Sequence, residues 1–578
     1  MKKTLKKRGQ KFLRKFSKAS IQASEDSKEH IKENFFERLS HIADIRLLIL
    51  EWGLLIVALI LLAVTQAFWF GDSFAQDAWT SGGTYTEAVT GEVNSMNPLF
   101  ATTNSEKVLS RLMFARIVTI DYSGHPKPEI AKTVKASEDG KVWTITIRDD
   151  YKWSDGEPIT RDDVLFTLGL VKNPAVNTAY DANLANVKVT EGENGEIVFT
   201  LPTSYADFIS ALTIPVLPKH VLGDSDPKTL IEHSFSNAPI CSGPFTFNAL
   251  QGNTLSSEKT FFLSRNESYA GGRVLLGSFA VRTFADRKDI IDALNNNTVT
   301  ASAELSGPDL DKVGNKQMLL KNSSLNSGAF IFFNTGSENL KSASVRSAIR
   351  QGIDVSELRE IARDTEPLDY PILKSQLKLS NYPAIPEFNL DEARAKINEL
   401  VGEEKPTLEI ATVNDGFLPE ITDQIAKDLE ALGYGVNVSK YEENQEFISN
   451  ILSKRSYDIL VYEVELGADP DPLPYYHSSQ ASSSGLNLSN YRNAMADDLL
   501  LAGRETLDET LRIKKYESFL EYWVSGAPAI GIYQPNLSYY YNKNVRTFSN
   551  DLRLVTALDR FADVEDWAVN KTTKNKTP

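Results

Sequence analysis

At 578 residues, the chain is too long for one ordinary hydrophobic core, so two or more lobes are expected. Its formal charge of −15 is uneven: residues 1–46 carry 13 Lys/Arg and 6 Asp/Glu, a balance of +7, which leaves −22 for the rest. The acidic body argues against nucleic acid as a partner, the single Cys241 excludes an internal disulfide and a cysteine-based zinc site, and with six scattered His no metal or other cofactor is expected.

The N-terminal segment, residues 1–46, is expected to lie on the cytoplasmic face of a membrane. Residues 2–18 hold nine basic side chains and no acidic one, a composition that favours anionic lipid. Ile31, Phe35, Leu39 and Ile42 then recur at helical spacing, which indicates an amphipathic helix on the membrane surface. Docking to a membrane partner is the alternative for this helix.

Residues 52–70 are nineteen positions without a charge, about 28 Å of helix and close to the thickness of a bilayer. Trp52 at one end and "FWF" at residues 68–70 resemble an interfacial belt. A removable signal peptide is the rival interpretation, but 46 residues precede the stretch. We therefore predict an uncleaved single-pass anchor over residues 47–70, an N-terminus in the cytoplasm, a linker over 71–81 and a body outside the cell membrane.

The body begins with short strand patterns of period two and turn signals, as in "VWTITIRD" and "VKVTEGENGEIVFTLP". In "YKWSDGEPITRDDV", residues 151–164, Asp155-Gly156 predicts a turn and Thr160 a helix cap. Later, helical patterns such as "FLPEITDQIAKDLEALG" alternate with strands such as "TLEIATV" and "YDILVYEV", which indicates α/β lobes with partly parallel sheets.

No enzyme motif is found: the sequence has no nucleophile elbow, zinc helix, phosphate loop or dinucleotide-binding turn, so catalysis is not expected. Asp162 and Asp163 fit a helix start better than acid–base chemistry. The loop "LGADPDPLPYYHSSQ", residues 466–480, follows a buried strand, where ligands commonly sit in α/β lobes. A rigid surface turn explains the same loop equally well.

Several stretches occur in the order found in bacterial extracellular solute-binding proteins of family 5, which the body at about residues 82–570 resembles. They are "NSMNPLF", "GHPKPEIAKTVKASEDGKVWTITIRDDYKWSDGEPITRDDVLFTL", "SGPFTF", "AFIFFNTGSENLKSASVRSAIRQGID", "DLEALGYGVNVSKY", "GADPDPLPYYHSSQASSSGLNLSNYRNAMADDLL" and "APAIGIYQPN". The family includes the dipeptide- and oligopeptide-binding subunits of ABC importers.

The resemblance implies an α/β, two-lobed fold of the periplasmic-binding-protein type II (cluster C) kind. It places lobe I at about 82–325 with 529–570, an inserted subdomain near 118–212, lobe II at 326–528 and a tail at 571–578. Strands near "SGAFIFFN" and "PAIGIYQP" would form the hinge. The implied function is capture of short peptides by a monomer that delivers them to ABC permease subunits.

The resemblance also implies a ligand site. An aspartate before the Asp/Glu-Pro dipeptide meets the ligand's ammonium group in the family, and Asp469 is the match, with Asp471 or Glu465 as alternatives because the loop is one residue shorter and lacks an aromatic. The other candidates are Asn97, Leu99, Ser242, Gly243, Tyr475, Tyr476, His477 and Asn487. For each of these, local packing is the competing interpretation.

Other functions stay open at this point. A surface sensor signalling through residues 1–46, and a binder of nickel complexes, haem or oligosaccharides, are alternatives to a peptide importer subunit, and a cell-surface peptidase is the least favoured.

Overall fold

The computed structural model describes residues 46–178, 180, 184, 186–252 and 258–575. The chain divides into two units, residues 1–78 with 572–578, and residues 79–571. In the first unit, α3 (Arg46–Phe74) leads into β1 (Ala75–Thr80), which pairs with β21 (Asn570–Asn575). The apolar side chains described on α3, such as Leu54 and Leu62, are exposed.

Two predictions concern this N-terminal unit. The amphipathic segment lies outside the described residues, apart from Arg46. A search of the residues that the structure describes finds no helix with the length and apolar character of a membrane span. The anchor over residues 47–70 therefore stays a prediction.

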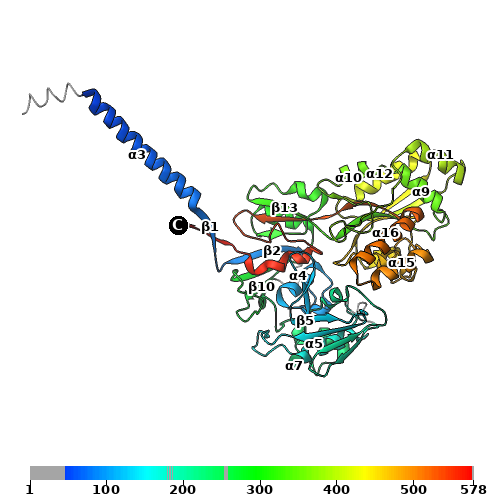
Figure 1. The fold of residues 1–578 in the computed structure, drawn as a ribbon, viewed down its shortest axis with the longest axis horizontal. Helices are drawn as coiled ribbons and strands as arrows, with labels where there is room; N and C mark the ends of the chain where they lie inside the picture. The colour runs from blue at the N-terminus through cyan, green and yellow to red at the C-terminus, as the bar shows by residue number, and fades with distance from the viewer. Residues whose placement is uncertain (1–45, 179, 181–183, 185, 253–257, 576–578) are drawn as a thin grey trace, which may run out of the picture. The chain divides into compact units, whose positions relative to one another are not determined.

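The first lobe of the second unit is built on a seven-stranded sheet (Figure 1). Its order is β13 (Met318–Ser324), β20 (Asn536–Asn542), β12 (Ala301–Ser302), β2 (Thr84–Thr90), β11 (Ser278–Phe284), β10 (Lys259–Arg265) and β9 (Phe245–Gly252). The central strand β2 runs parallel to β11 and β12, and the other pairings are antiparallel. Helices α4 (Asn104–Met113) and α8 (Arg287–Asn295) and the 3₁₀ segment η9 (Ala557–Asp566) belong to this lobe.

A smaller subdomain within this part of the chain carries the four-stranded sheet β5 (Ala131–Ala136), β6 (Val142–Ile147), β8 (Ile197–Thr200) and β7 (Lys188–Glu191). Its helix α5 (Arg161–Val171) starts after Thr160, and Asp163 closes the capping box, so the helix start predicted from residues 151–164 is confirmed. Buried Trp153 and the neighbouring side chains join one hydrophobic core with the first lobe.

The second lobe has its own core around a six-stranded sheet. The order is β15 (Glu366–Pro367), β19 (Ala529–Gln534), β14 (Ser327–Phe333), β18 (Ile459–Glu465), β16 (Thr407–Val413) and β17 (Gly435–Tyr441). All seven residues of β14 are buried between β18 and β19, as expected for a continuous apolar run. In contrast, β16 runs parallel to both of its neighbours.

Helices cover this second sheet because their apolar faces match it. Leu418, Ile421, Ile425 and Leu429 of α12 (Leu418–Ala431) are spaced by three or four residues and buried, each burial contributing about 1.5–3 kcal/mol. The other main helices are α9 (Ala343–Gly352), α10 (Val355–Ile361), α11 (Leu390–Val401), α15 (Ala494–Glu505) and α16 (Glu509–Gly526) (Figure 1).

The chain passes between the two large sheets at adjacent points. One lies between β13 and β14 and the other between β19 and β20, and the Leu325 amide donates to the Pro535 carbonyl at 2.9 Å. Gln534 also donates to the Leu325 carbonyl at 2.7 Å. The strand β19 pairs within the second lobe's sheet, so the sheet changes after residue 534, whereas the predicted return to lobe I begins at residue 529.

Candidate functional site

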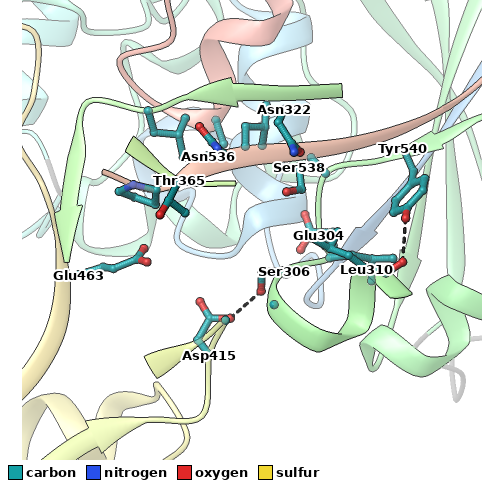
Figure 2. Close-up of a pocket in the computed structure, with 18 of the residues that line it drawn as sticks. Glu304, Ser306, Leu310, Asn322, Thr365, Asp415, Glu463, Asn536, Ser538 and Tyr540 are labelled. Carbon is teal, nitrogen blue, oxygen red and sulfur yellow. Dashed lines mark hydrogen bonds between the residues drawn. The ribbon is translucent and has the colours of Figure 1, made fainter. Parts of the chain in front are cut away.

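A cavity of about 510 Å³ lies where the two lobes face each other, beside the two crossing points. We call it the interlobe cavity. Leu325, Pro535 and Asn536 of the crossing segments line it, together with residues from both large sheets (Figure 2). A cavity bordered by the segments that connect two lobes can change shape when those lobes move.

The first lobe contributes one face of the β13–β20 ribbon. Leu320 and Asn322 of β13 lie opposite Tyr540 and Ser538 of β20, and all four line the cavity. Successive residues of a strand point to opposite faces, so these alternate positions form one wall. The Tyr540 hydroxyl donates to the Leu310 carbonyl at 2.7 Å, which fixes the ring (Figure 2).

The second lobe contributes carboxylates at the ends of two parallel strands. Glu463 and Glu465 are on β18, and Asp415 follows β16 by two residues. Asp415 accepts a hydrogen bond from Ser306 at 3.1 Å (Figure 2). It also pairs with Arg287 at 2.5 Å, and both partners are on the first lobe. The same carboxylate thus lines the cavity and connects the two lobes.

Glu463 receives one hydrogen bond, from the Tyr533 hydroxyl on β19 at 2.8 Å. Burial, aided by the nearby Asp415 and Glu443 carboxylates, raises the pKa of Glu463 to about 7, although the Tyr533 hydrogen bond opposes this. Burial also raises the pKa of Glu304, which accepts from Asn104 at 3.1 Å and from the Thr90 hydroxyl. The cavity therefore holds carboxylates that burial makes costly to ionise.

The lobes also meet through backbone at the rim. A Cβ atom on Gly307, whose φ is +56°, would lie 2.5 Å from the Gly416 carbonyl oxygen of the other lobe. Asp311 and Arg363 form a second ion pair between the lobes at 3.0 Å. This close approach leaves no room for a side chain at Gly307.

Of the three carboxylates predicted to meet a ligand, Glu465 is the one that lines the interlobe cavity. Burial raises the pKa of its side chain, and the Lys107 ammonium group opposes that rise. The hydroxyl of Tyr475, another predicted residue, donates to the Glu465 main-chain carbonyl. These two residues are therefore neighbours, although Tyr475 is not among the lining residues.

Asp469 and Asp471 are engaged within the protein. Asp469 pairs with Arg512 at 2.6 Å, and Asp471 pairs with Arg504 at 2.6 Å; both carboxylate side chains are buried. The second carboxylate oxygen of Asp469 has no hydrogen-bond partner among the residues that the structure describes. Both arginines belong to the α15–α16 helix pair.

The subdomain contacts the second lobe at Arg504, the ion-pair partner of Asp471. The Ala206 amide donates to the Arg504 carbonyl at 3.0 Å, and the Arg504 guanidinium lies 5.2 Å from the Tyr205 ring centre. Burial and the Asp469 charge raise the pKa of Asp207 to about 7. The predicted ammonium-binding loop is thus a contact between subdomain and second lobe in this structure.

The early-loop candidates make local contacts. The Asn97 side chain accepts from the Leu99 amide at 3.2 Å and both residues are buried. The Ser242 hydroxyl accepts from the Ala115 amide at 3.0 Å, and a Cβ atom on Gly243 would lie 2.7 Å from Met113 backbone. The Asn97 side-chain nitrogen is buried and lacks a hydrogen-bond partner within the described part of the chain.

The remaining candidates order the loop after Asp471. Tyr476 is buried against Trp523, His477 caps a 3₁₀ turn through Ser479, and Asn487 donates to the Tyr491 carbonyl at 2.9 Å. None of these three lines the interlobe cavity, and their role in binding stays a prediction.

Sequence reasoning missed Asp415, Glu463 and Tyr533. A signal for the first two is present, because both lie at the carboxyl ends of neighbouring parallel strands, where α/β sheets bind ligands. Tyr533 carries no local signal, since its contact with Glu463 joins residues 70 positions apart.

Comparison with known proteins identifies the family. Residues 125–487 match the bacterial extracellular solute-binding proteins, family 5 Middle. The oligopeptide-binding protein AppA of Bacillus subtilis is 24% identical over 481 residues, which are 79% of this chain and 87% of AppA.

Solved structures share the fold. The structure of Bacillus subtilis AppA in complex with a nonapeptide matches with a TM-score of 0.69 and 21% identity, over 85% of this chain and 100% of that one. NikZ of Campylobacter jejuni in complex with Ni(L-His) matches with a TM-score of 0.70 and 22% identity, over 84% and 99%. These likenesses confirm the predicted two-lobed α/β fold. The chain belongs to the bacterial extracellular solute-binding proteins of family 5.

Proposed function

We propose that this chain captures short peptides in the interlobe cavity and delivers them to an ABC importer. The observation that carries the proposal is the cavity itself, which both lobes line and which borders the two segments connecting them. Family membership and the name of the relative AppA, an oligopeptide-binding protein, support peptides as the solute. Binding without catalysis is the proposed activity, and the protein acts as a monomer.

The lining suits a short peptide. Asn322, Asn536 and Ser538 offer hydrogen-bonding side chains, while Leu310 and Leu320 offer apolar surface. Such a mixture can hold a peptide main chain and accept varied side chains. Of the predicted carboxylates, we propose that Glu465 meets the ligand's ammonium group, since Asp469 and Asp471 already pair with arginines.

We further propose that α3 tethers the protein to the cell membrane, with residues 1–46 in the cytoplasm and the lobes outside. The exposed apolar side chains described on α3 support this tether, because such a surface is unfavourable in water. A tether raises the effective concentration of a binding protein near a permease in the same membrane. We place the hinge at the two crossing points rather than within β14 or β19.

The test is native mass spectrometry of the full chain purified in mild detergent, followed by denaturation to release bound solute. A ladder of short peptides is expected. A single non-peptide solute, such as a nickel complex, would overturn the peptide proposal while retaining solute capture. A Glu465→Gln variant should bind the released peptides more weakly, whereas Glu430→Gln, at an exposed position of α12 outside the cavity lining, serves as its matched control.

A further inference from the structure

We infer that the interlobe cavity selects solutes with a positively charged side chain, and that Glu463, held by Tyr533, is the residue that determines this preference. The inference rests on the proposed function, because it takes the cavity as the solute site. It adds a chemical class of ligand: peptides that contain lysine or arginine.

The charge balance of the lining is the first observation. Six carboxylates line the cavity: Glu304, Asp311, Asp364, Asp415, Glu463 and Glu465. The four basic side chains are those of Lys107, Arg287, Arg363 and Arg560. Counted in this way, the lining has only a small excess of negative over positive side chains.

Existing ion pairs make the excess larger. Arg287 pairs with Asp415, Arg363 with Asp311, and Arg560 with the buried Glu87 beneath the cavity. Among the described lining residues, these pairs leave four carboxylates against the single ammonium group of Lys107. A cleft lined by one sign of charge concentrates solutes of the opposite sign.

Of these four carboxylates, Glu463 is the best placed to bind a cationic group of the ligand. Glu304 already accepts from Asn104 and Thr90, Asp364 is exposed, and Glu465 lies close enough to Lys107 for the ammonium group to affect its pKa. Glu463 instead receives one hydrogen bond, from a neutral hydroxyl, which orients the carboxylate without neutralising it.

The surroundings of Glu463 also favour a cation. The charged and titratable groups that face it are Asp415 after β16, Glu443 after β17 and Tyr533 on β19, and Arg287 faces it through its pair with Asp415. A ligand ammonium or guanidinium group in the cavity would therefore meet Glu463 and the Asp415 carboxylate, which is already paired with Arg287, while Glu443 lies outside the cavity lining. On the opposite wall, Leu310 and Leu320 can contact the aliphatic part of a lysine or arginine side chain.

Binding of a cation at Glu463 should release a proton near neutral pH. The pKa of Glu463 is raised to about 7, so the free site is partly protonated there, and a bound cation favours the ionised carboxylate. Affinity for a cationic peptide should therefore rise with pH through about 7 and fall below it. A neutral peptide should show little of this dependence.

The test uses three tripeptides, Ala-Lys-Ala, Ala-Gln-Ala and Ala-Glu-Ala, titrated by calorimetry into the full chain in detergent. We expect Ala-Lys-Ala to bind about tenfold more tightly than Ala-Gln-Ala, as one charge-assisted hydrogen bond allows. Glu463→Gln should remove that difference, and Glu430→Gln, at an exposed position of α12 outside the cavity lining, should preserve it. Two buffers of different ionisation enthalpy should reveal proton release with Ala-Lys-Ala.

The outcomes separate the two proposals. Equal affinities for all three tripeptides would overturn the cation preference and leave peptide capture standing. Binding of none would overturn both. If Glu463→Gln fails to fold, the wild-type protein still tests the role of Glu463. A preference for Ala-Lys-Ala without proton release near pH 7 would mean that another residue determines the selectivity.

Discussion

A buried ion pair beneath the interlobe cavity gives the sharpest prediction about stability. Glu87 of β2 and Arg560 of η9 are both almost fully buried, and two guanidinium nitrogens of Arg560 lie 2.7 and 3.0 Å from one Glu87 oxygen. The Tyr539 hydroxyl donates to the other oxygen at 3.0 Å. These contacts join residues 473 positions apart, so the pair fixes the end of the chain to the centre of the first lobe's sheet.

Replacing Arg560 with methionine should lower the free energy of unfolding by about 3–5 kcal/mol. Two charge-assisted hydrogen bonds at about 1.5–3 kcal/mol each give a sum of similar size. Most of the loss comes from Glu87, which is fully buried and would keep only the hydrogen bond from the Tyr539 hydroxyl. The double variant Glu87→Gln with Arg560→Met removes both charges and should recover at least half of the lost stability.

Urea unfolding of the full chain, followed by tryptophan fluorescence and far-ultraviolet circular dichroism, measures these differences. Single and double variants form a double-mutant cycle. A loss below about 1 kcal/mol for Arg560→Met would refute the reasoning, because it would mean that water reaches Glu87. A double variant as unstable as the sum of the singles would refute it equally, since the charges would then be independent.

Two further predictions concern closure of the lobes, and a third concerns the pH dependence of stability. Gly307→Ala should weaken solute binding by at least tenfold, because its Cβ atom would meet the Gly416 carbonyl. The control is Gly416→Ala: this position also has a positive φ, but a Cβ atom there meets only Ser306 at 4.0 Å, so most of the affinity should remain. Calorimetry would measure the affinities and small-angle scattering the closure, and equal effects of the two variants would indicate backbone strain alone. Tyr205→Ala should weaken binding by about 0.5–2 kcal/mol through loss of the Arg504 contact, and Tyr205→Phe, which keeps the ring, should retain it; identical affinities would contradict a role in closure. Because the folded-state pKa of Asp207 is raised to about 7, the folded protein binds more protons than the unfolded chain between about pH 4 and 7, so stability should fall as pH rises through that window. Asp207→Asn should flatten the fall in melting temperature, and an unchanged slope would assign the effect to other groups.

The features that were predicted well from the sequence depend either on neighbouring residues or on the order of motifs along the chain. Thr160 and Asp163 lie three residues apart and form the predicted cap because a capping box needs no distant partner. The two-lobed fold could be predicted because several family-like stretches occur in a fixed order along the body, and together they indicate the fold more strongly than any one of them does. Where each lobe begins was harder to place, because β19 and β20 are separated by one residue and belong to different sheets.

Asp469 shows why site residues are harder to predict than the fold. Its loop resembles the family's loop, although it is one residue shorter and lacks the aromatic, and its carboxylate is held by Arg512, a residue 43 positions later on α16. Nothing near Asp469 in the sequence indicates that partner. A cation already supplied by the protein lowers the benefit of a second one from the ligand, so an ion pair formed across the fold decides which carboxylates remain free.

Glu463 and Glu465 had a signal that spacing alone could reveal. They are two residues apart at the carboxyl end of β18, and both line the cavity. Two carboxylates at period two, at the end of an otherwise apolar strand, sit on the same side of that strand, where Glu463 is half-buried and Glu465 is exposed. Burial raises the pKa of Glu463 to about 7, so ionising this carboxylate costs free energy until a cation arrives. Their position at the end of a strand parallel to β16, next to Asp415, therefore supports the binding role that we propose for these residues.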